Sequence, residues 1–281
     1  MAKTTIIYLF LPLFFFFFFF FFFFSLTVAA ANTAYPTIPG TEPTNGCIPP
    51  VERRPIRREV HGNGRIYDVT HRITNSMPTY VDHVDGVGEF LRLTESIKNG
   101  SLSNLSELRF SVHTGTHIDA PGHVFDHYYD AGFDVDAVDL EVLNGPGLLV
   151  DVPRDKNISA EVLKSLNIAK GVRRVLFRTL NTDRRLMYKT EFDTSYVGFT
   201  EDGARWLVEN TEIKLVGTDY LPIAAFDDVL KGHYALLEST EIVVVEALKL
   251  DDVPAGIYSI HCLPLRVPGA EGAPTRCILI K

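Results

Sequence analysis

The sequence predicts an α/β fold: a single domain with a mixed, partly antiparallel sheet and short flanking helices. Three observations lead to this prediction. Short apolar runs rich in β-branched residues alternate with helical patterns through most of the chain. The last of these runs follow one another without long helices between them, which favours antiparallel pairing. Residues 65–281 also have a length that suits one domain.

Each predicted strand is a short apolar run, and most of these runs are bounded by glycine, proline or polar residues. The strands are expected over residues 65–70, 145–152, 173–179, 213–220, 241–248, 257–265 and 276–280. The run at 241–248 reads EIVVVEAL and has the composition of a buried strand. By composition alone, Glu246 near the end of that run would more often face solvent than the core.

Two helices are expected between the strands. Residues 159–166 begin with Ser159, a favoured N-cap, and have a carboxylate in the first turn. Residues 200–210 begin with Thr200 and place Ala204, Leu207 and Val208 on one side. Trp206 in this second helix is expected to belong to the core rather than to a substrate contact.

The N-terminus has the pattern of a secretory signal. Lys3 precedes a continuous apolar stretch over residues 6–24, which contains eleven consecutive phenylalanines, and small residues suited to cleavage near Ala30 or Ala31 follow. The alternative is an uncleaved membrane anchor, because the stretch is almost long enough to span a bilayer. We therefore expect a signal peptide over 1–31, a proline-rich extended lead-in over 32–64 and a folded domain over 65–281.

The signal pattern and the composition together predict where the protein acts and which partners it has. We expect the mature chain to be secreted and therefore extracellular, without stable membrane association after cleavage. The net charge of −8 and the lack of a basic stripe exclude nucleic acid as an expected partner. Three sequons, at Asn99, Asn104 and Asn157, would be glycosylation acceptors in a eukaryotic secretory path.

Cysteine is too scarce for a disulfide-built scaffold. Cys262 and Cys277 lie in two β-like segments that antiparallel pairing would bring close. Export would permit a bond between them, and two buried thiols are the alternative. Cys47 is left over in the proline-rich lead-in.

The most informative segment is HTGTHIDAPGH, residues 113–123. It holds His113, His117, Asp119 and His123, at spacings of four, two and four. Imidazole and carboxylate are the usual ligands of zinc and similar metals, and zinc takes about four of them. One short segment therefore supplies most of a metal site and a histidine that can move protons. A histidine-rich surface loop is the alternative, whereas His83 and His127 lack such spacing and are expected to be ordinary polar residues.

The residues between these ligands favour an extended chain with two bends over a helix. β-Branched residues disfavour the helix, and in a strand His117 and Asp119 point to the same side. Gly115 permits a turn that lets His113 join them. Pro121 and Gly122 then bend the chain and bring His123 back toward the same point.

This segment resembles the signature of the cyclase family of metal-dependent hydrolases, whose best-known enzymes are the bacterial kynurenine formamidases. The family pattern is H-x-G-T-H-x-D-x-P-x-H, and the chain matches every specified position. The resemblance extends over residues 67–281 and includes the runs GPGLLVDV and LVGTDY. It is strongest to the plant cyclase-like proteins, which are secreted and share an insert that reads VDGVGEFLRL here. The implied fold is the swivelling β/α fold of kynurenine formamidase, and family members are usually homo-oligomers.

The resemblance also implies a ligand set for two divalent ions, zinc or manganese. His113, His117 and Asp119 match the ligands of the first ion, and Asp119 bridges to the second. His233 and Glu246 match the remaining ligands of the second ion, and His123 matches the catalytic histidine. The stretch from His233 to Glu246 is one residue longer than in the bacterial enzymes, so the nearby residues Glu238 and Glu241 are alternatives to Glu246. Without the resemblance, His233 would be expected in a loop, and Asp219 either at the rim of the site or in a capping role.

The implied function is metal-dependent hydrolysis of a small aryl formamide, N-formylkynurenine, to kynurenine and formate in tryptophan breakdown. Two alternatives remain open. One is a hydrolase of a cyclic amide or lactone, as in isatin hydrolase relatives, because the ligands set the chemistry and the pocket walls set the substrate. The other is a secreted stress or cell-death regulator with a structural or weakly active metal site.

Overall fold

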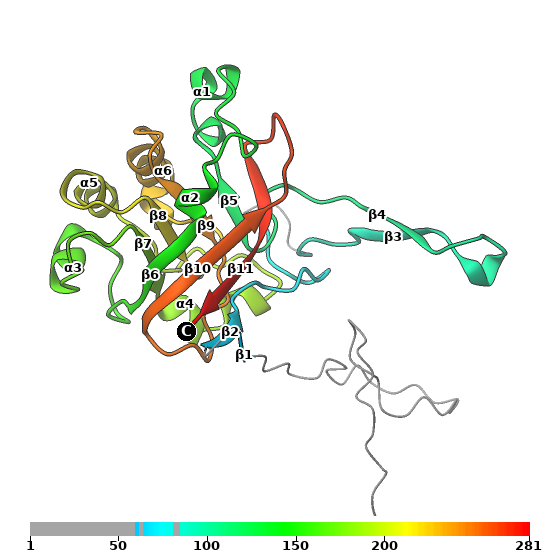
Figure 1. Cartoon of the computed structure of the whole chain (residues 1–281), viewed down its shortest axis with the longest axis horizontal. Coiled ribbons are helices and arrows are strands. Elements are labelled where there is room, and N and C mark those ends of the chain that lie inside the picture. The colour runs from blue at the N-terminus through cyan, green and yellow to red at the C-terminus, as the bar shows by residue number, and fades with distance from the viewer. Residues whose placement is uncertain (1–59, 62–63, 81–84) are drawn as a thin grey trace, which may run out of the picture. The chain divides into compact units, whose positions relative to one another are not determined.

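A computed structural model describes residues 60–61, 64–80 and 85–281 of the chain (Figure 1). The expected signal peptide, Cys47, His83 and nearly all of the lead-in lie outside these residues. The described end of the lead-in forms β1 (Val60–His61) and the first residue of β2 (Gly64–Asp68), so the extended region predicted over 32–64 already contains strand structure. None of the helices in the described ranges combines the length and the apolar character needed to cross a bilayer.

A mixed sheet forms the body of the molecule, as predicted. Its order is β1-β2-β11-β10-β6-β7-β8-β9-β5, and a further pairing of β5 with β11 closes the strands from β11 round to β5 into a ring. Besides β1 and β2, the sheet contains β5 (His117–Asp119), β6 (Asn144–Asp151), β7 (Arg174–Arg178), β8 (Leu215–Thr218), β9 (Val243–Glu246), β10 (Gly256–Pro264) and β11 (Gly272–Ile280). All seven predicted strands are present, at slightly different bounds.

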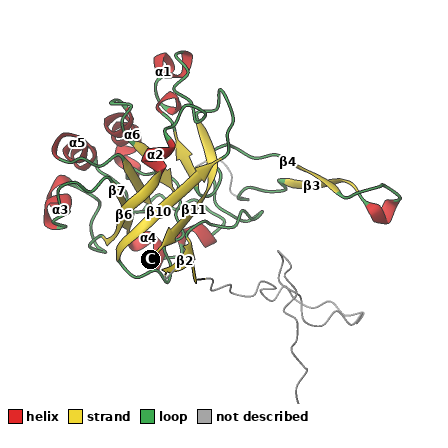
Figure 2. Cartoon of the chain, viewed as in Figure 1, coloured by secondary structure: helices red, strands yellow, loops and turns green. Residues whose placement is uncertain are grey.

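The sheet divides into a parallel and an antiparallel half. Strands β6 to β9 pair in parallel, whereas β10 pairs antiparallel with both β6 and β11. The two predicted helices are α3 (Ala160–Ser165), capped by Ser159, and α5 (Glu201–Asn210), capped by Thr200. Together with α6 (Val229–Leu237), they lie beside the parallel strands (Figure 2).

Strand β7 illustrates why the parallel strands have continuous apolar sequences. Val175 and Phe177 pack in a cluster with residues of α3, α5 and α6, and Leu176 between them points into a separate cluster with the antiparallel strands. Both faces of the strand are covered, so polar alternation is absent. Burial of Phe177 alone contributes about 2–3 kcal/mol. Trp206 packs against the cluster that includes Phe177, in agreement with the predicted core role.

The remaining helices are short. They are α1 (Asp126–Asp130), α2 (Leu140–Leu143), α4 (Leu180–Asp183), and the 3-10 turns η1 (Ile97–Asn99), η2 (Pro121–His123), η3 (Leu186–Tyr188) and η4 (Phe226–Asp228). Helix α6 was not predicted, because Gly232 and His233 interrupt its apolar pattern.

A second sheet consists of β3 (Leu91–Glu95) and β4 (Leu105–Leu108), which pair only with each other (Figure 1). The sequence analysis assigned no strand here. Side chains on this hairpin are largely exposed, and they include several large apolar ones: Leu91, Leu93, Ile97, Leu102, Leu105 and Leu108.

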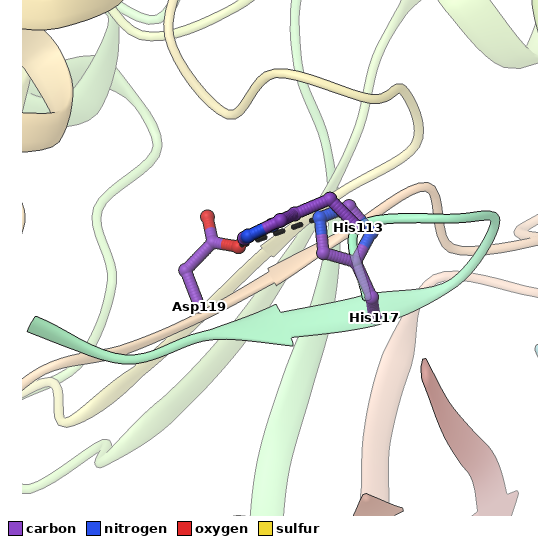
Figure 3. A group of neighbouring side chains, drawn as sticks. All are labelled: His113, His117 and Asp119. Carbon is purple, nitrogen blue, oxygen red and sulfur yellow. Dashed lines mark hydrogen bonds and ion pairs between the residues drawn. The ribbon is translucent and has the colours of Figure 1, made fainter. Parts of the chain in front are cut away.

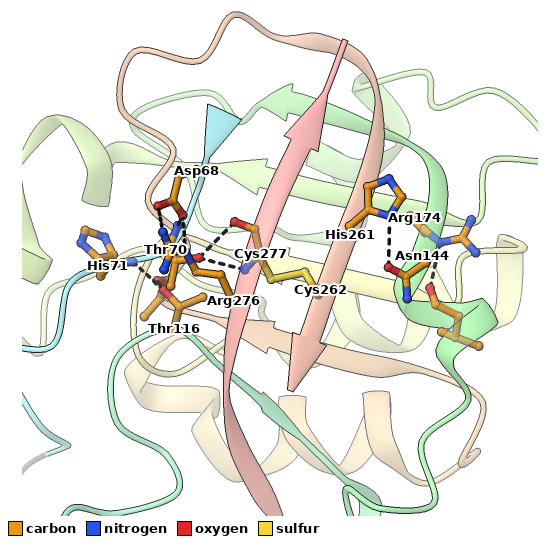
Figure 4. Close-up of a disulfide and its surroundings, with 12 residues drawn as sticks. Asp68, Thr70, His71, Thr116, Asn144, Arg174, His261, Cys262, Arg276 and Cys277 are labelled. Carbon is orange, nitrogen blue, oxygen red and sulfur yellow. Dashed lines mark hydrogen bonds and ion pairs between the residues drawn. A yellow bond between two sulfur atoms is a disulfide. The ribbon is translucent and has the colours of Figure 1, made fainter. Parts of the chain in front are cut away.

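The structure joins Cys262 and Cys277 in a disulfide (Figure 4). The two residues are direct partners in the β10–β11 ladder, so antiparallel pairing brings them together as the spacing suggested. Of the two alternatives, the bond is therefore the one observed. The backbone of Cys277 also bonds twice with the hydroxyl of Thr70, which ties the segment after β2 to β11.

Candidate active site

Strand β5 carries two of the candidate ligands and occupies the place where the ring of strands closes. It pairs antiparallel with β9 on one side and with β11 on the other. In the β9 ladder His117 lies directly opposite Glu246. Directly opposed residues in an antiparallel pair share a face, as do His117 and Asp119 two positions apart. Sheet register thus brings Glu246 to the motif from a distant part of the sequence.

The turn before β5 returns His113 to the same point. Gly115 has φ of +65°, a left-handed conformation that glycine adopts without strain. Thr116 fixes the turn, because its hydroxyl donates to the carbonyl of Ala247 at 2.6 Å and accepts from the amide of His71 at 2.9 Å. The turn predicted at Gly115 is therefore present.

Three donor groups of the motif converge (Figure 3). Nδ1 of His113 lies 2.9 Å from Oδ1 of Asp119, and Nε2 of His117 lies 3.4 Å from the same oxygen. The other ring nitrogen of His117, Nδ1, lies 2.8 Å from the carbonyl of Gly115. That contact leaves Nε2 of His117 directed at the carboxylates, as expected for a ligand whose second nitrogen is held by a backbone oxygen.

His233 and Glu246 join the same cluster from distant parts of the sequence. His233 lies in α6, not in a loop, and its Nδ1 is 2.5 Å from the carbonyl of Val229 one turn earlier. Its Nε2 lies 3.1 Å from Oε1 of Glu246 and 3.8 Å from Oδ2 of Asp119. Oε2 of Glu246 is 3.4 Å from Nε2 of His117. The carboxylate of Asp119 therefore lies between His113 and His117, and that of Glu246 lies between His117 and His233.

The burial of these groups fits a cation. Glu246 and His233 are each 5% exposed, and Asp119 is 1% exposed. Among the residues that the structure describes, neither Oδ2 of Asp119 nor Nε2 of His113 has a hydrogen-bond partner, and both atoms are buried. An isolated buried carboxylate is costly unless positive charge or a hydrogen bond meets it. A divalent ion bound by oxygen and imidazole nitrogen would supply that charge.

The pKa shifts in the cluster also indicate that its two carboxylates attract positive charge. Burial by itself lowers the pKa of His117 and of His233, but the adjoining carboxylates of Asp119 and Glu246 raise both to about 9. Burial opposes ionisation of Asp119, yet hydrogen bonds from His113 and His117 hold its pKa well below the usual range. Burial, together with the charge of Asp119, raises the pKa of Glu246. A bound cation would take the place of the protons that the histidines otherwise attract.

His123 lies in the turn η2, so Pro121 and Gly122 bend the chain as predicted. Its ring centroid is 4.1 Å from that of His113 and 5.9 Å from that of His233. Burial lowers its pKa to about 4, against the attraction of Asp119. The ring is therefore neutral at neutral pH, the form that accepts a proton.

The four histidines and Glu246, but not Asp119, line a cavity of about 500 Å³. Apolar and aromatic side chains make up most of the rest of its wall: Tyr80, Val124, Leu221, Pro222, Val229 and Leu230. A concave apolar pocket with a few convergent polar groups is the usual form of a small-molecule site.

The structure brings all six predicted site residues together. Of the alternatives to Glu246, Glu238 is exposed and Glu241 pairs with Lys214, whereas Glu246 meets two histidines. His127 is exposed and stacks against Tyr128, in keeping with an ordinary polar residue.

Asp219 and Glu271 are two further acidic residues whose positions bear on the site. Asp219 bonds to the amide and hydroxyl of both Thr179 and Thr182, so the capping alternative describes it. Glu271 was not predicted, and it lies 3.4 Å from Nε2 of His113. No local pattern in the sequence marks Glu271, because it reaches the site through the β5–β11 pairing.

The family model that matches this chain, described as "Putative cyclase", covers residues 67–225. Cyclase-like protein 2 of Arabidopsis thaliana is 63% identical over 269 residues, which cover 96% of this chain and 98% of that protein. Kynurenine formamidase of Bacillus cereus is 34% identical over 183 residues, 65% of this chain and 82% of the relative. A solved structure described as a "Potential Metal-Dependent Hydrolase With Cyclase Activity" matches with a TM-score of 0.62 and 31% identity, over 77% of this chain and 98% of that one.

Proposed function

The chain belongs to the cyclase family, and on that premise we propose that it is a metal-dependent hydrolase of a small amide. One observation carries the proposal: three histidines and Glu246, drawn from distant segments, converge with Asp119, whose Oδ2 is buried and has no hydrogen-bond partner among the described residues. The family relatives include a kynurenine formamidase and a protein described as a metal-dependent hydrolase, which supports the same reaction class.

His113, His117 and Asp119 would hold one divalent ion, and Asp119, His233 and Glu246 a second. Zinc and manganese both accept this set of nitrogen and oxygen donors. Such ions lower the pKa of a bound water toward about 7 and polarise a carbonyl oxygen. The protein itself holds the donors in place, through the backbone carbonyls of Gly115 and Val229 that bond to the ligating histidines.

His123 is the proton carrier in this proposal. Its ring borders the cavity and is neutral at neutral pH, so it can accept a proton from the attacking water. It then donates that proton to the nitrogen that leaves as the amide bond breaks. The products are a carboxylic acid and an amine, and the proton that His123 takes up is returned in the same turnover.

We propose an aryl formamide, N-formylkynurenine, as the substrate. The cavity volume suits one aromatic ring with a short side chain, and Tyr80, Val124 and Leu221 give it an apolar wall. The name of the Bacillus cereus relative supports this substrate class. A cyclic amide such as isatin is the nearest competitor, because it would present a similar ring to the same wall.

The test combines metal analysis with turnover of purified protein on N-formylkynurenine and on isatin. We expect one to two equivalents of zinc or manganese, and release of formate from N-formylkynurenine. Turnover of isatin alone would keep the hydrolase and replace the substrate. Bound metal without turnover of either compound would favour a regulatory role with a structural metal site.

We also propose that the mature protein is extracellular and associates with copies of itself. The first of these rests on the signal pattern alone. The second is supported by the exposed leucines of the β3–β4 hairpin, which would be covered in a homo-oligomer. Size-exclusion chromatography with light scattering would test it, and replacement of Leu91 and Leu93 by serine is expected to reduce the measured mass.

A further inference from the structure

Glu271 stands beside the donor cluster without belonging to the ligand set proposed above. It immediately precedes β11, and its Oε1 lies 3.4 Å from Nε2 of His113. The donor atoms of Glu271, His113 and His123 all lie within 4.8 Å of one another. The carboxylate is 35% exposed, whereas that of Asp119 is 1% exposed.

The backbone around Glu271 is shaped to the ring of His113. The carbonyl of Glu271 accepts from the amide of Ala120 at 2.9 Å, and Gly272 pairs with Asp119 in the β5–β11 ladder. A Cβ atom at Gly272 would lie 2.5 Å from Cε1 of His113 and 2.9 Å from both ring nitrogens. The imidazole therefore occupies the space that a side chain at position 272 would need.

The two nitrogens of His113 have different surroundings. Nδ1 faces Asp119 at 2.9 Å, on the side of the donor cluster. Nε2 is buried and has no hydrogen-bond partner within the described part of the chain, and Oε1 of Glu271 lies 3.4 Å from it. An imidazole that binds a cation through Nδ1 carries its proton on Nε2, and a buried N–H needs an acceptor. The carboxylate of Glu271 is placed to supply it.

On the premise of the function proposed above, we propose that Glu271 is a positioning residue for the ligand His113. Its carboxylate accepts the Nε2–H bond and holds the ring with Nδ1 toward Asp119. Carboxylates that orient a ligating histidine in this way increase metal affinity. Nδ1 of His117 and of His233 meets a backbone carbonyl instead, so among the three ligating histidines a side chain performs this task only for His113.

His123 is the other ring within reach of Glu271, and the two partners predict different losses. A carboxylate that acts on His113 controls metal binding. A carboxylate that acts on His123 controls proton transfer and leaves metal binding unchanged. Metal affinity therefore separates the two, and it can be measured without any substrate.

The experiment compares Glu271→Ala, Glu271→Gln and the control Glu238→Ala with the wild type. Glu238 is exposed and also acidic, and it lies outside the donor cluster. Zinc dissociation constants are measured by competition with a chromophoric chelator, and the visible absorption of the cobalt-substituted proteins reports the geometry of the ligands. Thermal unfolding of the metal-free proteins verifies that each variant folds.

We expect Glu271→Ala to weaken zinc binding by about 10- to 100-fold and to shift the cobalt absorption bands. Glu271→Gln recovers part of the affinity, because its amide oxygen still accepts a hydrogen bond. Glu238→Ala matches the wild type. A Glu271→Ala variant that binds zinc as tightly as the wild type overturns the assignment, whether or not its turnover falls. A wild type that binds no zinc or cobalt would instead remove the proposed function itself.

Discussion

Asp119 and Asp219 are buried almost equally, at 1% and 2% exposure, but their carboxylates have opposite surroundings. Asp219 accepts from two backbone amides and two hydroxyls, all supplied by Thr179 and Thr182. Asp119 faces His113 and His117 through Oδ1, whereas its Oδ2 lies 3.8 Å from Nε2 of His233 and has no hydrogen-bond partner among the described residues. A carboxylate whose lone pairs are filled by neutral donors holds a fold together, whereas one left open among histidines is ready to bind a cation.

The largest effect is expected from Asp119→Asn, which tests the open carboxylate without creating a cavity. Because Asp119 belongs to both proposed ion sites, we expect zinc affinity to fall by more than about 100-fold and turnover to disappear. Equilibrium dialysis with metal analysis measures the first, and formate release the second. Unaltered zinc binding in this variant would contradict the role assigned to Asp119.

His123→Ala separates the donors from the proton carrier within the same cluster. The change removes a ring that accepts a proton but leaves His113, His117 and Asp119 in place, so the metal content should be retained. We expect kcat to fall by about 10²- to 10⁴-fold. Loss of metal together with activity would show instead that His123 is a ligand.

Asp219→Asn makes the same chemical change at the carboxylate whose oxygens accept hydrogen bonds from Thr179 and Thr182. One oxygen becomes an NH2 group that faces existing donors, so the hydrogen bonds that Thr179 or Thr182 donate to that oxygen are broken, while those to the other oxygen can remain. We expect a loss of about 2–3 kcal/mol in the free energy of unfolding, measured by urea denaturation, with zinc stoichiometry unchanged. If the folded Asp219→Asn variant bound fewer zinc ions than the wild type, Asp219 would also contribute to metal binding, and the proposed difference between the two aspartates would be wrong.

The smallest effect concerns His71, a buried histidine outside the donor cluster, whose ring is also attracted by the charge of Asp251. Burial lowers its pKa to about 4, whereas an unfolded histidine titrates near 6.5. Between these values the unfolded chain binds more protons, so the contribution of His71 to stability is present above pH 6.5 and lost as the pH falls toward 4. The loss is about 1–2 kcal/mol at pH 5.

His71→Phe removes this titration and keeps an aromatic ring against Tyr188. We therefore expect the variant to lose less stability than the wild type between pH 7 and pH 5, in urea denaturation of the metal-free proteins. An identical loss in the two proteins would mean that His71 is not the group responsible.

The parallel strands β7 and β8 were predictable because burial on both faces demands a continuous apolar run, as Val175 to Phe177 illustrate, whereas β10 and β11 alternate in burial along much of their length. The first four site residues were predictable for a different reason, since they lie within one short segment. Glu246 and His233 required the family resemblance. Their approach depends on the β5–β9 register and on a helix whose pattern Gly232 interrupts.

Other features had no signal that local reasoning could use. Glu271 reaches His113 only through the β5–β11 pairing, and nothing in its neighbourhood marks it. The β3–β4 hairpin was missed because all residues of its two strands are exposed among the described residues, so the leucines at 91 and 93 give no core-facing pattern. Contacts between distant segments, and strands without a buried face, are thus the parts that one sequence leaves undetermined.

The most direct measurement of the central claim is the position of a bound cation. A crystal of the protein soaked with zinc, with diffraction recorded at the zinc absorption edge, would locate the ion by its anomalous signal. We predict a peak within coordination distance of His113, His117 and Asp119, with any second peak between Asp119, His233 and Glu246. A fully zinc-loaded crystal with no anomalous peak beside Asp119 would contradict the account.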